Sequence, residues 1–287
     1  MPGRTLDQLP IPPDRFRVDL QLASFETLEA AVAEDSLRSC RLRDLAKLRP
    51  GKLSGKLAAR LAAVLDPANN SVTSHTLASS RYMRNLRIRF TGAVLKLVNE
   101  DRTGTVIRAD VIKPVWAVDL RGLRNLDLKK LKEAFRGDLF RAARKLLGPD
   151  KGPEGFLLAV LHGEFETAEG VYQPHYHLVA TGDWAAIVNS LRVQPGYRRS
   201  GRVKRPVRIK RELTNLPYAL SYLLKSYWPA KWAGHVSGVN AARRSRGHQR
   251  IPEPYHSELL LWLNKWKIGD IILKIGVKQG KEGLYVT

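Results

Sequence analysis

The alternation of apolar and polar positions is clearest in the middle of the chain. Residues 156–167 and 173–181 are rich in apolar and aromatic side chains, and residues 168–170 between them form an Ala-Glu-Gly turn signal. These segments predict a β-hairpin. Upstream, apolar residues recur with a period of about 3.6 over residues 126–147, and Gly148-Pro149 ends the pattern. This period predicts a long amphipathic helix before the hairpin.

The N-terminal quarter has a helical pattern. It extends from Phe25 to Leu65 and is broken at Pro50-Gly51, which predicts two helices before a turn-rich linker over residues 68–80. Residues 1–20 are polar with several prolines, and we expect a loosely held arm there. Lysines and arginines are frequent in the helical part. They fit a small DNA-binding element and equally a solvated basic face on a packing domain, and the pattern does not separate the two.

Short apolar runs and helical periods predict the remaining elements. The expected strands are residues 93–98 paired with 105–112, then 115–120, 204–213, 271–277 and 284–286. The expected helices are residues 184–191, 216–228 with Asn215 as N-cap, and 255–266. We therefore expect an α+β fold in which helices pack on a central antiparallel sheet, preceded by a small helical N-terminal region.

The predicted hairpin carries residue types that bind metals. Side chains two apart on a strand share a face, so His175 and His177 point the same way while Tyr176 points opposite. One histidine and two glutamates also share a face of the incoming strand. The hairpin can thus place two imidazoles and a carboxylate around one divalent cation, although a surface hairpin with two solvated histidines has the same short motif. The expected third ligand is, in order of preference, Glu164, which is centred in its strand, Glu166 and His162.

The helix expected over residues 216–228 carries a second group of polar residues. Tyr218, Tyr222 and Lys225 lie at positions i, i+4 and i+7, which form one stripe of a helix. A stripe of tyrosines alone is usually core packing. A lysine at the end of the stripe fits packing less well, because an unpaired buried ammonium group is costly.

The two motifs together resemble those of the HUH endonucleases, specifically the rolling-circle replication initiators of plasmids and single-stranded DNA phages. Gln-Pro-His-Tyr-His at residues 173–177 is similar to the family's metal motif, and the Tyr-x3-Tyr-x2-Lys spacing over residues 218–225 is similar to its two-tyrosine nucleophile motif. The histidines precede the tyrosines, as in initiators, whereas conjugative relaxases have the reverse order. The resemblance covers residues 114–228.

This resemblance implies a domain division and a strand order. Residues 81–250 would form an HUH-type nuclease domain, with residues 115–120 as its first core strand. Residues 1–80 would precede it as an arm and a basic helical region, and residues 251–287 would follow as a helix and a short hairpin.

The implied reaction is nicking of single-stranded DNA at a replication origin by metal-assisted tyrosine transesterification, which leaves a 5′-phosphotyrosine and a free 3′-hydroxyl. Tyr222 is the expected nucleophile, because it lies a full turn inside the predicted helix with Lys225 at i+3, and Tyr218 is expected to act in a later transfer. Mixed imidazole and carboxylate ligands suit Mn²⁺ or Mg²⁺, with Zn²⁺ as an alternative. A transposase with the same residues and a non-catalytic DNA-binding regulator are the alternative functions.

The charge of the chain supports a polyanionic partner. The formal net charge is +22, and basic residues gather around the two motifs. A protein that coats ribosomal RNA or an anionic membrane would have a similar charge. No Walker motif is present, so we expect no nucleotide cofactor and a separate host helicase. The candidate DNA-contacting residues are Tyr197 as a stacking ring, Arg198, Arg199, Arg202, Lys210, Trp232, Arg243 and Arg244.

Targeting signals and cysteines give a simple picture. No apolar run approaches the ~20 residues that a transmembrane helix needs, and the first residues lack the features of a signal peptide. The single cysteine, Cys40, rules out a disulfide framework and a cysteine-based zinc finger. We expect a cytoplasmic protein without a membrane partner.

Overall fold

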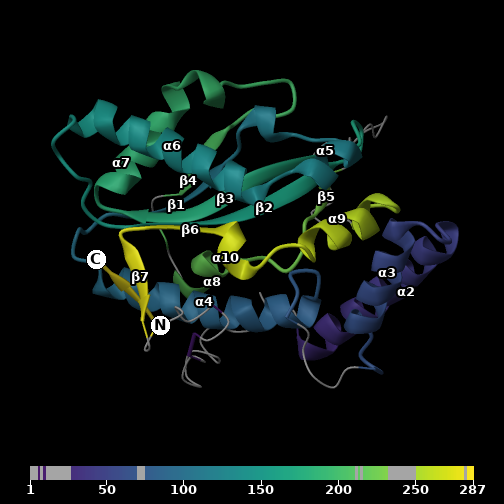
Figure 1. The fold of residues 1–287 in the computed structure, drawn as a ribbon. Helices are drawn as coiled ribbons and strands as arrows, with labels where there is room; N and C mark the ends of the chain where they lie inside the picture. The colour runs from purple at the N-terminus through teal and green to yellow at the C-terminus, as the bar shows by residue number, and fades with distance from the viewer. Residues whose placement is uncertain are drawn as a thin grey trace, which may run out of the picture.

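The computed structural model describes residues 6, 9–10, 27–69, 75–210, 213, 216–231, 250–280 and 283–287. In these ranges the chain has the α+β architecture that the sequence predicts, with helices first and a mostly antiparallel sheet with flanking helices after them (Figure 1). The helices are α2 (Leu28–Leu48), α3 (Leu53–Leu65), α4 (Ser80–Glu100), α5 (Leu120–Asn125), α6 (Leu128–Leu147), α7 (Asp183–Ser190), α8 (Leu216–Ser221), α9 (Tyr255–Leu263) and α10 (Ile268–Ile271). The strands are β1 (Val106–Val111), β2 (Leu157–Glu166), β3 (Val171–Thr181), β4 (Val207–Lys210), β5 (Ala230–Lys231), β6 (Ile272–Ile275), β7 (Val277–Gly280) and β8 (Gly283–Val286).

The predicted hairpin, β2 and β3, forms the centre of the sheet. The strand order is β4-β1-β3-β2-β5, and β6 also pairs with β2. All of these pairings are antiparallel except that of β2 with β5. Between β2 and β3 the chain turns at residues 167–170, where Gly170 has a φ of 64° that other residues rarely adopt. This turn pairs His162 directly with His175.

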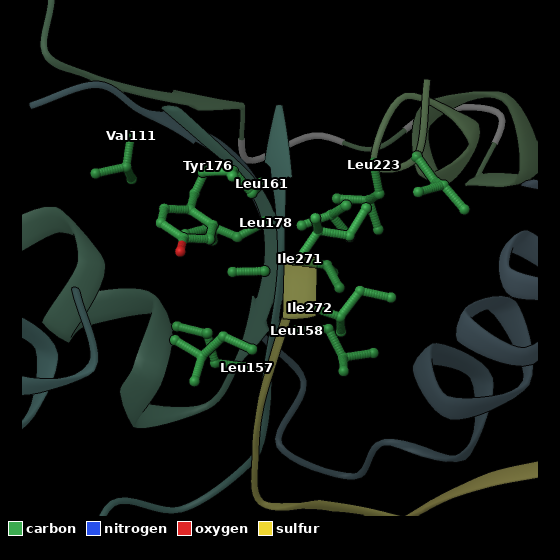
Figure 2. Close-up of a cluster of buried hydrophobic side chains, with 14 of the residues drawn as sticks. Val111, Leu157, Leu158, Leu161, Tyr176, Leu178, Leu223, Ile271 and Ile272 are labelled. Atoms are coloured by element: carbon green, nitrogen blue, oxygen red, sulfur yellow. The ribbon is translucent and has the colours of Figure 1, made fainter. Parts of the chain in front are cut away.

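Helices cover both faces of the sheet. In Figure 1, α6 and α7 lie above the sheet, and α4 and α8 lie below it. Figure 2 views the sheet on edge: Tyr176, Leu178 and Val111 lie on one side, and Leu223 and Ile271 lie on the other. Alternate residues of β2 and β3 therefore enter two separate layers of core, because successive side chains of a strand point to opposite faces.

The N-terminal helices form a smaller unit. Helices α2 and α3 pack against each other and against α9, and their shared core includes Leu42, Leu61 and Leu260. A carboxylate fastens this unit to the rest of the chain, since Glu258 of α9 accepts hydrogen bonds from Arg49 and Arg124. Both expected helices and the break between them at Pro50-Gly51 are thus present.

One expected hairpin is replaced by a helix. Residues 93–98, predicted as a strand, belong to the long helix α4, and the predicted partner strand is β1, which pairs with β3 and β4 instead. Within α4 the buried residues Tyr82, Leu86, Phe90 and Val94 recur every four positions, which is a helical period. Read alone, the apolar run at its end has no period that separates strand from helix.

The expected strand at residues 115–120 is also wrong. Pro114–Trp116 form a short 3-10 turn, η3, and only Val118 makes an isolated bridge, to Tyr172. Helix α5 then begins directly after Asp119, whose carboxylate caps it by accepting from the Gly122 N–H. The sheet position next to β3 is filled by β1, so β1 is the first strand of the core.

Candidate metal centre and tyrosine pair

Three buried histidines meet on the α4 and α8 side of the sheet. His162 comes from β2, and His175 and His177 come from β3. The Nδ1 atom of His162 lies 3.4 Å from Nε2 of His175, which lies 2.9 Å from Nε2 of His177. In the part of the chain that the structure describes, this is the one group of three potential metal ligands with ligand atoms within 4.8 Å of one another.

The outer nitrogen of each ring is held by a backbone carbonyl. Nε2 of His162 lies 2.8 Å from the Tyr227 oxygen, and Nδ1 of His177 lies 2.8 Å from the Tyr222 oxygen. Nδ1 of His175 lies 3.2 Å from the carbonyl of Gln173. A carbonyl only accepts, so each outer nitrogen carries the hydrogen and each inner nitrogen carries a lone pair.

The inner nitrogens therefore suit a cation. Burial lowers the pKa of all three histidines, that of His175 to about 4, so the rings are neutral near pH 7. Three neutral rings with their lone pairs turned toward one another cannot satisfy one another by hydrogen bonds. Orientation of ligand histidines by carbonyls on the opposite ring nitrogen is the usual arrangement around bound metals. The donor set thus fits a divalent metal ion.

The group of candidate ligands differs from the expected one in its third member. Glu164 and Glu166 lie nearer the turn, where both carboxylates accept from the Lys231 ammonium group. They do not join the histidine group. His162, the last of the three candidates from sequence, takes that position because the turn at residues 167–170 sets it opposite His175.

A carboxylate from another strand also lies near the histidines. Asp110 of β1 pairs in register with His177, and its Oδ1 lies 4.0 Å from His177 Nε2. This oxygen is inaccessible to solvent and has no hydrogen-bond partner within the described ranges. The sequence pattern did not indicate Asp110, because a pairing between β1 and β3 was not predicted and a single aspartate in a strand has no motif.

The tyrosine helix ends earlier than predicted. Helix α8 stops at Ser221, so Tyr222 lies just beyond it and Lys225 is not on the helix. Tertiary donors take the carbonyls that would continue the helix: Arg87 Nε donates to the Ser221 carbonyl over 2.9 Å, and His177 occupies the Tyr222 carbonyl. The predicted helix over residues 222–228 is therefore wrong, and the backbone there orients two of the three histidines. The expected N-cap, Asn215, lies outside the described residues.

The two tyrosine hydroxyls nevertheless meet. Tyr218 Oη lies 2.6 Å from Tyr222 Oη, and Tyr218 is 43% exposed. The Lys225 ammonium lies 5.1 Å from the centroid of the Tyr222 ring, and the Arg108 guanidinium lies 5.2 Å from it. The hydrogen bond with Tyr218, together with partial burial, raises the pKa of Tyr222, and the charges of Arg108 and Arg87 act in the opposite direction. The structure thus gathers all three residues of the predicted nucleophile motif.

The candidate DNA-contacting residues divide into several groups. Arg198, Arg199 and Lys210 are exposed near the edge strand β4, whereas Arg202 is paired with Glu169. Tyr197 does not offer a stacking ring: it is 2% exposed, and its hydroxyl donates to Asp138 over 2.8 Å. Its predicted contact with bases is corrected to a packing role. Trp232, Arg243 and Arg244 lie outside the described residues.

Among the helices of the described ranges, none combines the length and the apolar character that a membrane span requires. Comparison with known proteins adds no further constraint. No family model, curated protein or solved structure matches this chain.

Proposed function

We propose that this chain is a metal-dependent endonuclease that nicks and joins single-stranded DNA through a tyrosine nucleophile, as the HUH replication initiators do. One observation carries the proposal: a single backbone segment, residues 222–228, links the histidine group to the tyrosine pair. It begins with Tyr222, and its carbonyls at Tyr222 and Tyr227 orient His177 and His162. A packing role for the histidines does not account for three lone pairs that point toward one another.

The donor set bears on the metal. Three neutral imidazoles suit a transition-metal ion such as Zn²⁺ better than Mg²⁺, and the nearby carboxylate of Asp110 would add the oxygen that Mn²⁺ prefers. An ion held by His162, His175 and His177 would supply Lewis-acid polarisation of a non-bridging phosphate oxygen. The sequence-based preference for Mn²⁺ or Mg²⁺ assumed a glutamate ligand. Because Glu164 accepts from Lys231 instead, the remaining ligands are imidazoles, which favour Zn²⁺ or Mn²⁺.

In the proposed reaction Tyr222 Oη attacks the scissile phosphorus. A new P–O bond to tyrosine forms, the P–O3′ bond breaks, the phenol loses its proton and the 3′ oxygen gains one. The Tyr218 hydroxyl, 2.6 Å away, is placed to attack in a later strand transfer. Arg108 and Lys225 lie over the Tyr222 ring and stabilise the phenolate that forms. The products are a 5′-phosphotyrosine and a free 3′-hydroxyl, which can prime replication.

A covalent adduct is the direct test. The full-length protein is incubated with a pool of single-stranded DNA that contains a randomised region, with Mn²⁺, Zn²⁺ or Mg²⁺ in separate reactions. An adduct that resists SDS is digested, and the modified residue is located by mass spectrometry. We expect the adduct on Tyr222, its loss in chelator, and its loss in His175→Ala.

A matched control separates the nucleophile from general tyrosine chemistry. Tyr285→Phe removes the hydroxyl of a β8 tyrosine whose side chain is about as exposed as that of Tyr218, and it should leave the adduct intact. An adduct that persists in the double variant Tyr218→Phe/Tyr222→Phe would contradict the proposal. DNA binding without an adduct in any of the three metals would instead support a non-catalytic DNA-binding regulator.

A further inference from the structure

A basic cavity opens at the edge of the sheet formed by β4. Its volume is about 610 Å³, and it lies between β4 and two short 3-10 turns, η4 (Leu191–Val193) and η5 (Pro195–Tyr197). Its lining contains no acidic residue. Five arginines line it, and all five are exposed: Arg192, Arg198, Arg199, Arg205 and Arg208.

These arginines have no carboxylate counter-ion among the residues that the structure describes. The neighbouring Arg202, by contrast, is paired with Glu169. Guanidinium groups stay charged and repel one another, so five of them around one cavity favour an anionic ligand with several charges. The forked donors of arginine match phosphate oxygens in geometry as well as in charge.

The cavity is joined to the histidine group by one row of the sheet. Arg208 on β4 pairs in register with Asp110 on β1, and Asp110 pairs with His177 on β3. Residues directly opposite on antiparallel strands share a face, so Arg208 projects from the same face as His177. Two strand spacings separate them, about 10 Å. Val207 and Ile209, which also line the cavity, project from the opposite face, so an extended polyanion in the cavity would pass around the edge strand at Arg208 to reach the histidines.

The lining also indicates which part of a nucleic acid the cavity contacts. The one aromatic residue in it, Tyr197, is buried and bonded to Asp138, so the lining offers no exposed ring that could stack on a base. Without stacking rings, the contacts are those of arginines with phosphates, which position a strand but carry no sequence information.

We propose that this cavity binds the phosphodiester backbone of single-stranded DNA beside the bond that is cleaved, and that the strand runs along Arg208 to the three histidines. The proposal rests on the function proposed above for its position relative to the cleaved bond. The binding of phosphates in the cavity does not depend on cleavage.

The first experiment measures affinity and its salt dependence. The triple variant Arg198→Gln/Arg205→Gln/Arg208→Gln is compared with a control triple, Arg102→Gln/Arg121→Gln/Arg144→Gln, which removes the same charge from exposed arginines outside the cavity. Binding of fluorescent oligo(dT) is followed by anisotropy in EDTA, which prevents metal-dependent cleavage. Circular dichroism verifies that both variants fold.

We expect the cavity triple to bind at least about tenfold more weakly at near-physiological salt. Its log–log salt slope should flatten by about 0.7 for each phosphate that the variant no longer neutralises. The control triple should bind less than about threefold more weakly. If both triples lost affinity for oligo(dT) equally, the loss would be explained by net charge alone, and the proposal would be overturned. A reduction confined to duplex DNA would overturn it as well.

A second experiment locates the phosphates. Single neutral methylphosphonate linkages are placed at successive positions of an oligonucleotide that contains the mapped cleavage site. We expect one or two neutral linkages near that site to weaken binding by the parent protein but not by the cavity triple, because the two changes remove the same interaction. Additive effects at every position would contradict the proposed path.

The two proposals can fail separately. If the adduct forms but the cavity triple binds normally, the nuclease stands and the strand takes another path. If the cavity triple loses affinity for oligo(dT) but no adduct forms in any metal, the cavity remains a backbone-binding site of a non-cleaving protein, and its placement beside a cleaved bond is wrong.

Discussion

On one face of the β2–β3 hairpin, Leu161, Tyr176 and Leu178 are buried toward α6, where the Tyr176 ring stacks on Phe135 with centroids 4.4 Å apart. On the other face His162 and His175 are equally buried, in the same strands and only one residue away. The first face is filled by apolar contacts that need no partner. On the second face, the inward nitrogen of each histidine carries a lone pair, and one oxygen of Asp110 has no hydrogen-bond partner among the described residues. A bound cation would satisfy these atoms. Burial alone thus does not distinguish a packed core from a candidate binding site. The two are distinguished by whether their buried polar atoms have hydrogen-bond partners.

The largest expected effect breaks function on the histidine face without touching the core. Tyr222→Phe should lower the rate of adduct formation by at least about a thousandfold, because the nucleophilic oxygen is gone. The free energy of unfolding should change little, since the hydroxyl is near the surface. Tyr218→Phe should spare the first cleavage and slow a later strand transfer. Quenched-flow assays on the mapped oligonucleotide measure both steps, and an equal reduction of first cleavage in the two variants would refute this division of roles.

The apolar face should give the opposite result. Leu178→Ala removes a fully buried side chain and should lower the free energy of unfolding by about 2–5 kcal/mol, because a cavity remains. Its affinity for metal should stay close to that of the parent protein. Urea denaturation and metal titration on the same variant measure the two quantities. A large drop in metal affinity in the folded variant would show that the two faces are not separable.

The third prediction tests whether His162 or Glu164 is the third metal ligand on the histidine face. His162→Ala should weaken binding of Zn²⁺ or Mn²⁺ by about a hundredfold or more, whereas Glu164→Ala should change it by less than about threefold. Metal-dependent thermal shifts provide a second measurement, since metal at about 100 times the Kd stabilises the fold by about 2.7 kcal/mol. The reverse ranking would return the glutamate to the ligand set.

A smaller effect is expected for Asp110. Asp110→Asn keeps the shape and removes the charge near His177, so metal affinity should fall by about tenfold. Calorimetric titration with Mn²⁺ measures this change, and Asp119→Asn, which alters a carboxylate at the start of α5, serves as a control. Equal affinity in the parent protein and the Asp110 variant would leave the histidines as the whole site.

The sequence predicted what local patterns encode. Alternation and a turn signal were sufficient for β2 and β3, and a period of about 3.6 was sufficient for α6. The same local reasoning failed at residues 93–98, where a short apolar run is compatible with both helix and strand, and at 222–228, where Arg87 and His177 replace the bonds of a helix. At residues 222–228, helix propensity is overridden by hydrogen-bond donors that are distant in sequence, and a local pattern does not contain them.

The candidate site was predictable to a similar depth. His175 and His177 share a face by spacing alone, and the tyrosine motif indicated a second group. The choice of His162 over Glu164 depends on a register that the length of the turn decides, and Asp110 depends on which strand lies next to β3. These are long-range pairings, and side-chain spacing within one segment does not contain them.

Gly163, the residue after His162, has a consequence for how this chain varies in evolution. A Cβ atom at this position would overlap the indole ring of Trp228, which lies directly against the strand. Trp228 ends the segment that orients His162 and His177. A larger residue at 163 therefore demands a smaller one at 228, and natural relatives should show the two positions changing together. Gly163 and Trp228 are expected to covary more strongly than either does with its neighbours in sequence.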